Sequence, residues 1–231
     1  MLVFHIVAGT VALLAGFAAL FSPKGGRVHR RAGTAFALAM LAMSASGAAM
    51  AASNDGPGSR ISVIAGLLSF QLVASGGWTV RPAARFARVV PRVLALLAAA
   101  TTLLALTMVA LAIANGGRHD GLPAPAYAIF GSLAALAALG DARLLAGRRL
   151  DGRQRLARHL WRMGTAMTIA TMSFFLGQAD EFPAWLRHGL VSAGPPLLVL
   201  GTVLGYFVRV RWRRGAGPGR ASPQASAILR R

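Results

Sequence analysis

Long apolar segments alternate with short polar segments along the whole chain. Each apolar segment is close to the ~20 residues that an α-helix needs to cross ~30 Å of hydrocarbon. The expected spans are residues 2–21, 33–52, 61–80, 93–114, 125–145, 159–179 and 189–208. Because a helix satisfies its own backbone hydrogen bonds in lipid, and the tight alternation of a barrel is missing, the pattern predicts an all-α polytopic transmembrane bundle of about seven helices.

The polar connections between these spans differ in charge. The first, third and fifth connections and the carboxyl-terminal tail carry clusters of basic residues, whereas the other three hold one arginine each together with acidic residues. The acidic residues of these three connections are Asp55, Asp120, Asp180 and Glu181. Since basic connections stay on the cytoplasmic side, we expect the amino terminus outside and the carboxyl terminus inside.

The apolar pattern is that of one domain followed by a tail. We expect residues 1–214 to form the transmembrane domain. The first span lacks a basic region before it and is followed by charge, so a transmembrane helix is favoured over a signal peptide. Residues 215–231 are rich in Gly, Pro, Ser and Arg, a composition that predicts a disordered basic tail.

Composition agrees with a membrane protein, since 55% of residues are hydrophobic and 13% are charged. The net charge of +19 lies in the connections, which favours contact with anionic headgroups on the cytoplasmic side over binding of nucleic acid. All but one of the 25 basic residues are arginine, a bias typical of GC-rich bacteria, so we expect the bacterial inner membrane. The absence of cysteine excludes disulfides and thiolate chemistry.

A short internal repeat links the second and sixth spans. Residues 31–35 read R-A-G-T-A and residues 162–166 read R-M-G-T-A, each shortly after a histidine and at the start of an outward-running helix. The repeat predicts that these two helices are equivalent members of two-helix units. Small residues recur on one face of both helices, which indicates faces that pack inside the bundle.

Few polar side chains lie within the spans, and two of opposite charge suggest a partnership. Asp141 falls near the inner end of the fifth span and Arg162 one turn inside the sixth. Burying a charge in a membrane is costly unless it is paired, so we expect a structural ion pair between Asp141 and Arg162. Gln71 lies near mid-depth in the third span, where it serves either helix packing or contact with a substrate.

Sequence motifs give no support to an enzyme. The chain has no P-loop, no H-E-x-x-H and no G-x-S-x-G, and its acidic residues avoid the middle of the spans. A hydrolase, an NTPase and a pump that depends on a mid-membrane carboxylate are therefore disfavoured.

Histidines are the remaining candidate ligands. His29 and His159 open the second and sixth spans at matching depth on the inner side, and His5 and His188 lie at comparable depth on the outer side. Two histidines at one depth on different helices suit bis-imidazole ligation of a b-type haem. Glycines one turn along, at positions 9 and 33, would leave room for the macrocycle. The candidate partners of the haem propionates are Arg30 and Arg162.

Two alternatives for the histidines stay open. Histidine is common at membrane boundaries, where it packs or contacts headgroups without binding a cofactor. A divalent metal site at His119, Asp120 and His188 ranks below haem, because it needs two outer connections to converge.

The pattern H-x3-G-x2-A-L-x2-G-x2-A-L over residues 5–20, followed by K-G-G-R-V-H-R-R-A-G at 24–33, resembles a family of bacterial inner-membrane proteins classified as a domain of unknown function. The resemblance covers the first two helices best, with an echo at R-H-L-W-R-M-G in residues 158–164. It implies a multi-pass membrane topology, and it assigns no catalytic residue.

Three functional classes remain after this reading of the sequence. The most concrete is an accessory membrane protein that transfers electrons through b-type haem. The alternatives are a carrier of small solutes or lipids, with Gln71 beside a central cavity, and a sensor or scaffold whose basic inner surface meets anionic lipid.

Overall fold

The computed structural model describes residues 1–178, 181–183 and 189–212. In these ranges the chain forms seven α-helices, one short 3-10 helix and one two-stranded hairpin. The α-helices are α1 (Leu2–Phe21), α2 (Arg27–Ala52), α3 (Ser59–Val80), α4 (Val90–Ala114), α5 (Ala124–Leu145), α6 (Gly152–Phe175) and α7 (Leu190–Trp212). The predicted all-α class is confirmed.

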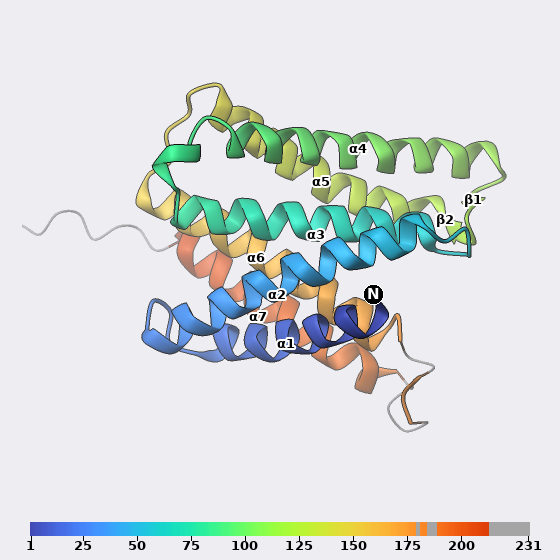
Figure 1. The fold of residues 1–231 in the computed structure, drawn as a ribbon, viewed down its shortest axis with the longest axis horizontal. Coiled ribbons are helices and arrows are strands. Elements are labelled where there is room, and N and C mark those ends of the chain that lie inside the picture. Colours follow the sequence, from blue (N-terminus) through green and yellow to red (C-terminus); the bar gives the residue numbers. More distant parts are fainter. Residues whose placement is uncertain (179–180, 184–188, 213–231) are drawn as a thin grey trace, which may run out of the picture.

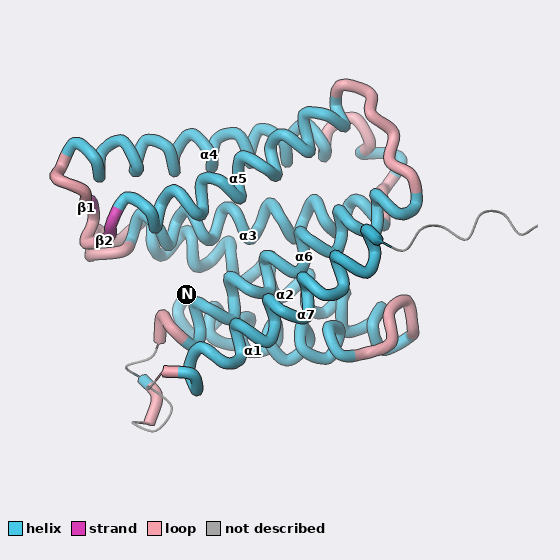
Figure 2. The backbone as a smooth tube through the Cα atoms, turned by 180° about the vertical axis from the view of Figure 1, so that it is seen from behind, coloured by secondary structure: helices cyan, strands magenta, loops and turns pink. Residues whose placement is uncertain are grey.

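The helices run roughly along one common direction and form two groups on either side of α3 (Figures 1 and 2). On one side, α4 and α5 pack against each other and against α3. On the other side, α1, α2 and α6 complete a ring with α3, in which α1 contacts α2, α2 contacts α3, α3 contacts α6 and α6 contacts α1. Helix α7 packs on the outside of α6. Helices α2 and α6 therefore lie diagonally across the ring.

Several helices begin earlier than the apolar pattern predicts. Helix α2 starts at Arg27 and α6 at Gly152, so most of the basic residues before both predicted spans are already helical. Asp151 caps α6, since its Oδ1 accepts a hydrogen bond of 2.7 Å from the backbone N–H of Gln154. In the polar stretch at residues 23–33, only residues 23–26 form a turn, and His29 lies in the first turn of α2.

Six helices in the described ranges are long and apolar enough to cross a membrane, and α6 is not among them. Its first half carries Arg153, Arg155, Arg158 and Arg162. Yet α6 is the helix whose second half is most enclosed, because almost every residue from Gly164 to Thr171 is buried by α1, α3 and α7. A helix that is surrounded by protein needs no apolar face toward lipid.

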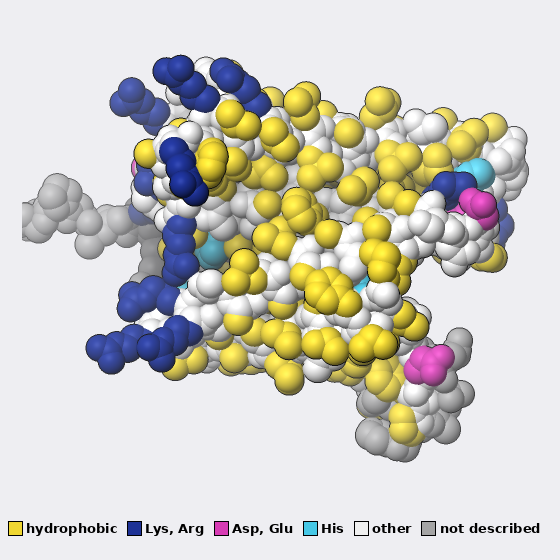
Figure 3. Space-filling model, viewed as in Figure 1, with side chains coloured by type: hydrophobic (Ala, Val, Ile, Leu, Met, Phe, Trp, Pro, Cys, Tyr) yellow, Lys and Arg dark blue, Asp and Glu magenta, His cyan; other side chains and the backbone are white. Residues whose placement is uncertain are grey.

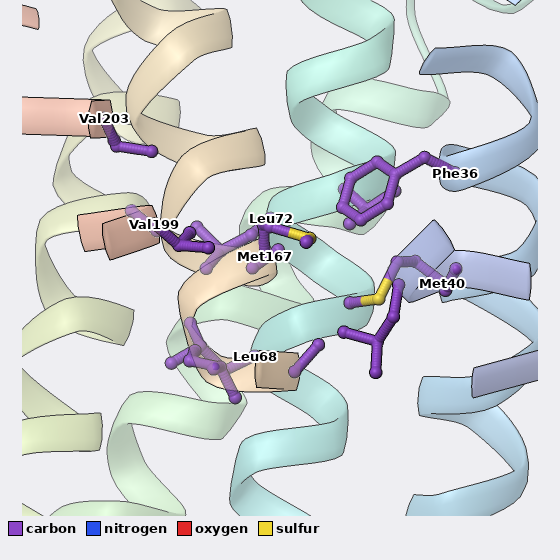
Figure 4. Packing of buried hydrophobic residues seen from close by; sticks show 14 of the residues in the cluster. Phe36, Met40, Leu68, Leu72, Met167, Val199 and Val203 are labelled. Carbon is purple, nitrogen blue, oxygen red and sulfur yellow. The ribbon is translucent and has the colours of Figure 1, made fainter. Parts of the chain in front are cut away.

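The core of the ring is an apolar cluster from six helices, α1, α2, α3, α5, α6 and α7. Phe36, Met40, Leu72 and Met167 meet there, with Val199 of α7 alongside (Figure 4). The sides of the molecule carry exposed large apolar side chains, such as Leu96 at 71% and Leu103 at 68% exposure. Lysine and arginine gather at one end of the bundle and acidic side chains at the other, with apolar side chains between (Figure 3). This is the surface of a membrane-spanning protein.

At the acidic end, the hairpin of β1 (Arg118–His119) and β2 (Leu122–Pro123) ties α3 to α5. Asp120 adopts a positive φ of 50° in the turn, and its Oδ2 accepts a hydrogen bond of 2.9 Å from the backbone N–H of Arg60. The Tyr127 hydroxyl donates to the carbonyl of His119 at 3.0 Å. Asp120 therefore holds the amino-terminal end of α3.

Candidate functional site

The two inner histidines lie at the basic end, on the diagonal pair of the helix ring. His29 belongs to α2 and His159 to α6, and both imidazoles are half-buried. Histidine side chains are visible among the arginines of this end in Figure 3. The two histidines therefore lie on diagonal helices of the ring, His29 against α1 and His159 against α3.

Both imidazoles are anchored through the same ring nitrogen. His29 Nδ1 donates to the carbonyl of Ala19 on α1, and His159 Nδ1 donates to the carbonyl of Gly76 on α3, each at 3.0 Å. A carbonyl only accepts, so each neutral ring carries its proton on Nδ1 and its lone pair on Nε2. Neither Nε2 has a hydrogen-bond partner within the described residues. This tautomer suits a ligand to a metal centre, whose second nitrogen is usually held by a hydrogen bond.

The free space near His29 differs from that near His159. A Cβ added to Gly33, one turn after His29, would meet no other described atom within 4 Å. A Cβ added to Gly77 on α3 would lie 3.7 Å from the tip of Met163. The open space predicted beside Gly33 is therefore present, and on the α6 side the nearest neighbour is the flexible end of a methionine.

Of the predicted outer pair, His5 and His188, the described ranges contain His5. His5 Nδ1 lies 3.0 Å from the carbonyl of Met43 and 3.2 Å from Ser46 Oγ on α2. Gly9 offers no room for a macrocycle, because a Cβ there would lie 3.2 Å from Met43 Sδ, so that expectation was wrong. His188 lies outside the described residues.

The described residues of the outer connections give no support to the alternative of a divalent metal site. His119 Nδ1 lies 3.4 Å from Asn115 Nδ2, and the Asp120 carboxylate is engaged with the start of α3. Among the residues that the structure describes, no group of three or more potential metal ligands occurs.

A second polar site lies deeper, where α3, α5 and α6 meet. Arg162 is fully buried, and its Nη2 lies 3.1 Å from Asp141 Oδ1 and 2.9 Å from the carbonyl of Ala137. Its Nη1 donates to Asp141 Oδ2 at 3.3 Å and to the Ser75 hydroxyl. The predicted ion pair thus forms, and it leaves only Nε of Arg162 free for a propionate.

Two further side chains complete this cluster. Arg158 Nη2 also pairs with Asp141 Oδ1, and its Nε donates to Thr79 Oγ1 at 2.9 Å. Gln71 Nε2 donates to Asp141 Oδ2 at 2.7 Å. We call Gln71, Ser75, Thr79, Asp141, Arg158 and Arg162 the buried ion cluster. The sequence analysis did not identify Arg158 as a partner of Asp141. A signal was present, because polar residues recur every four positions on both helices. They are Gln71, Ser75 and Thr79 on α3, and Arg158 and Arg162 on α6.

The remaining basic side chains near the histidines lie closer to the surface. Arg30 is exposed, and its Nη1 donates to the carbonyl of Gly25 at 3.0 Å. Arg81, at the end of α3, donates to the Thr34 hydroxyl of α2 at 3.0 Å and acts electrostatically on His159. Lys24 lies over the Tyr206 ring at 4.6 Å, and partial burial lowers the pKa of its ammonium group.

An apolar groove of about 470 Å³ runs between α2, α3 and α4. Small residues such as Ser44, Ala48 and Gly66 line it, and none of the candidate histidines does. The groove is therefore separate from both the histidine pair and the buried ion cluster.

Comparison with known proteins gives one family. The model of the family described as "Predicted membrane protein (DUF2306)" matches residues 2–145, which contain α1 to α5 and hence His5, His29 and Asp141. No curated protein and no solved structure matches the chain.

Proposed function

This chain belongs to DUF2306, a family of predicted membrane proteins, and we propose that it is a multi-pass membrane protein that transfers electrons through a b-type haem held by His29 and His159. One observation carries the proposal. The two imidazoles come from diagonal helices at one end of a helix ring, and each is fixed by its Nδ1 so that Nε2 lacks a protein partner.

The donor set fits a haem. Two neutral imidazoles in the Nδ1–H tautomer are the ligands of bis-histidine b-type haem, and the backbone carbonyls hold the rings in that state. One turn after His29, a Cβ added to Gly33 would meet no other described atom within 4 Å, so no side chain crowds the helix at that point. When bound, haem supplies an iron centre that takes up and releases one electron.

Other residues of the chain have supporting roles in this proposal. Ala19 and Gly76 orient the two rings through their carbonyls. Arg81 and Arg30 bring positive charge to the same end of the bundle, which favours carboxylate groups there. The apolar cluster around Met167 excludes water from the centre of the ring.

Absorption spectroscopy tests the proposal. Protein purified from haem-replete cells should show a Soret band that sharpens on reduction, and His29→Ala and His159→Ala should each lose most of it. His119→Ala is the matched control, because this half-buried histidine lies at the opposite end, and it should keep the wild-type spectrum. A wild-type protein without a Soret band, or histidine variants that keep it, would refute the haem.

The carrier alternative finds less support. Gln71, which that reading places beside a cavity, is fully buried and donates to Asp141. The ring interior is occupied by Phe36, Met40, Leu72 and Met167.

The setting of the protein is part of the proposal. The basic end would face anionic headgroups on the cytoplasmic side of a bacterial inner membrane, which puts the amino terminus of α1 outside. Electron transfer would then begin or end on the cytoplasmic side, where His29 and His159 lie.

A further inference from the structure

Two polar atoms in the buried ion cluster lack partners. Gln71 Oε1 and Arg162 Nε are buried and make no hydrogen bond with the described residues. Both side chains are fully buried. In each of these side chains, another nitrogen donates to the same carboxylate oxygen. Gln71 Nε2 lies 2.7 Å and Arg162 Nη1 3.3 Å from Asp141 Oδ2. In native proteins such atoms nearly always have a partner.

The two atoms need opposite partners. Arg162 Nε carries a hydrogen and needs an acceptor, whereas Gln71 Oε1 has lone pairs and needs a donor. Exchanging the oxygen and nitrogen of the Gln71 amide would turn its oxygen toward the Asp141 carboxylate, so the observed orientation is the favourable one. A single ligand that bridges both atoms therefore has to accept and donate at once.

This requirement decides between charged and neutral ligands. The cluster holds two guanidinium groups against one carboxylate, a net charge of +1, which by itself would attract an anion. A simple anion would satisfy Arg162 Nε, but it has no hydrogen for Gln71 Oε1. A cation would be repelled by both arginines. A small neutral hydroxyl compound fits, and water is the smallest one.

The cluster also offers a polar route to this position. Arg158 lies nearest the basic end, with 11% of its side chain exposed, and contacts Thr79. Ser75 is one turn further along α3, and Gln71 is one turn beyond Ser75. Thr79, Ser75 and Gln71 thus form a polar stripe that leads from the basic end into the bundle.

We propose that water enters between α3, α5 and α6 from the basic end, and that a bound water molecule satisfies Arg162 Nε and Gln71 Oε1 at the inner end of the polar stripe. The proposal is independent of haem binding. It predicts an aqueous environment at Ser75, in contrast to the apolar core on the other faces of α3.

Thiol labelling tests this in a chain that has no cysteine of its own. Ser75→Cys is compared with Val73→Cys in membranes, using a small water-soluble thiosulfonate. The two positions are equally buried, at 2% and 1% exposure, but Val73 belongs to the apolar core. Water and the nearby guanidinium groups favour the thiolate, so Ser75→Cys should react about tenfold faster or more. Equal rates would overturn the proposal.

A second measurement uses the wild-type protein, in case Ser75→Cys does not fold. In arginine-labelled protein in nanodiscs, the Nε–H resonance of Arg162 should show magnetisation transfer from water. The resonance is identified by its loss in Arg162→Lys. A buried Nε–H without transfer from water would overturn the proposal, and the result does not depend on whether haem is bound.

Discussion

At the scale of the residue, Asp141 is the centre of the strongest interactions in the bundle. Its carboxylate accepts from Arg158, Arg162 and Gln71, and all of these side chains are largely or fully buried. Both guanidinium groups that pair with Asp141 belong to α6. Asp141 is therefore an anchor for α6.

Asp141→Asn should be strongly destabilising. The change leaves two arginines in the protein interior without their counter-charge, and breaking a buried ion pair from one side costs about 3–5 kcal/mol. Thermal unfolding of the protein in detergent measures the effect. The matched control is Asp55→Asn, whose exposed pair with Arg60 is worth about 0–1 kcal/mol. Similar losses in the two variants would contradict the anchoring role of Asp141.

At the scale of the element, α6 is the helix that the apolar pattern describes least well. It is held by α3 through polar contacts along its first half and by α7 through close packing along its second half. Gly164 marks the closest approach, because a Cβ there would overlap the side chain of Val203. The absence of a side chain at this point lets α6 and α7 touch.

Gly164→Ala should separate α6 from α7 and destabilise the protein by about 1–3 kcal/mol, the usual range for overpacking. Gly201→Ala on α7 is the control, since a Cβ there meets no other described atom within 4 Å. In that open position alanine should be neutral or stabilising by about 0.5–1 kcal/mol, because glycine weakens helix interiors. The unfolding midpoints of the two variants test this prediction. If both variants are destabilised, the cause is a general sensitivity of α7 to substitution and not the contact at Gly164.

Helices α2 and α6 share one hydrogen-bond pattern, whereas the two-helix unit stays a prediction, because α6 bonds in this way to α3 and not to the preceding α5. His29 of α2 donates to α1, and His159 of α6 donates to α3, through the same ring nitrogen. In each case the acceptor is a carbonyl near the end of the neighbouring helix. The correspondence of α2 and α6 therefore extends from five residues of sequence to a shared hydrogen-bond pattern.

At the scale of the whole molecule, charge separates the two ends of the bundle (Figure 3). The separation predicts an orientation that single cysteines can report. Ala87→Cys, in the exposed basic connection after α3, should react with an impermeant thiol reagent only from the cytoplasmic side. Asn54→Cys, in the exposed connection after α2, should react only from the outside. The reverse pattern would show that the assigned topology is inverted.

The sequence by itself determined the fold class, the approximate helix positions and the charged ends, because hydrophobic length and basic connections follow directly from the solvent that lipid provides. It also indicated the Asp141–Arg162 pair, since charges inside spans need partners. It misplaced the start of α2 by six residues, from Gly33 to Arg27, because helix propensity continues into polar residues where the apolar pattern stops.

Only the tertiary structure decided which side chains meet across the bundle. The order of contacts in the helix ring puts α2, which carries His29, diagonally opposite α6, which carries His159. The carbonyls of Ala19 and Gly76 that fix the two rings carry no signal in the sequence, since every residue has a backbone carbonyl. The unpaired atoms of Gln71 and Arg162 likewise carry no signal in the sequence. They are identified only once the partners of the other donors and acceptors in the cluster are known.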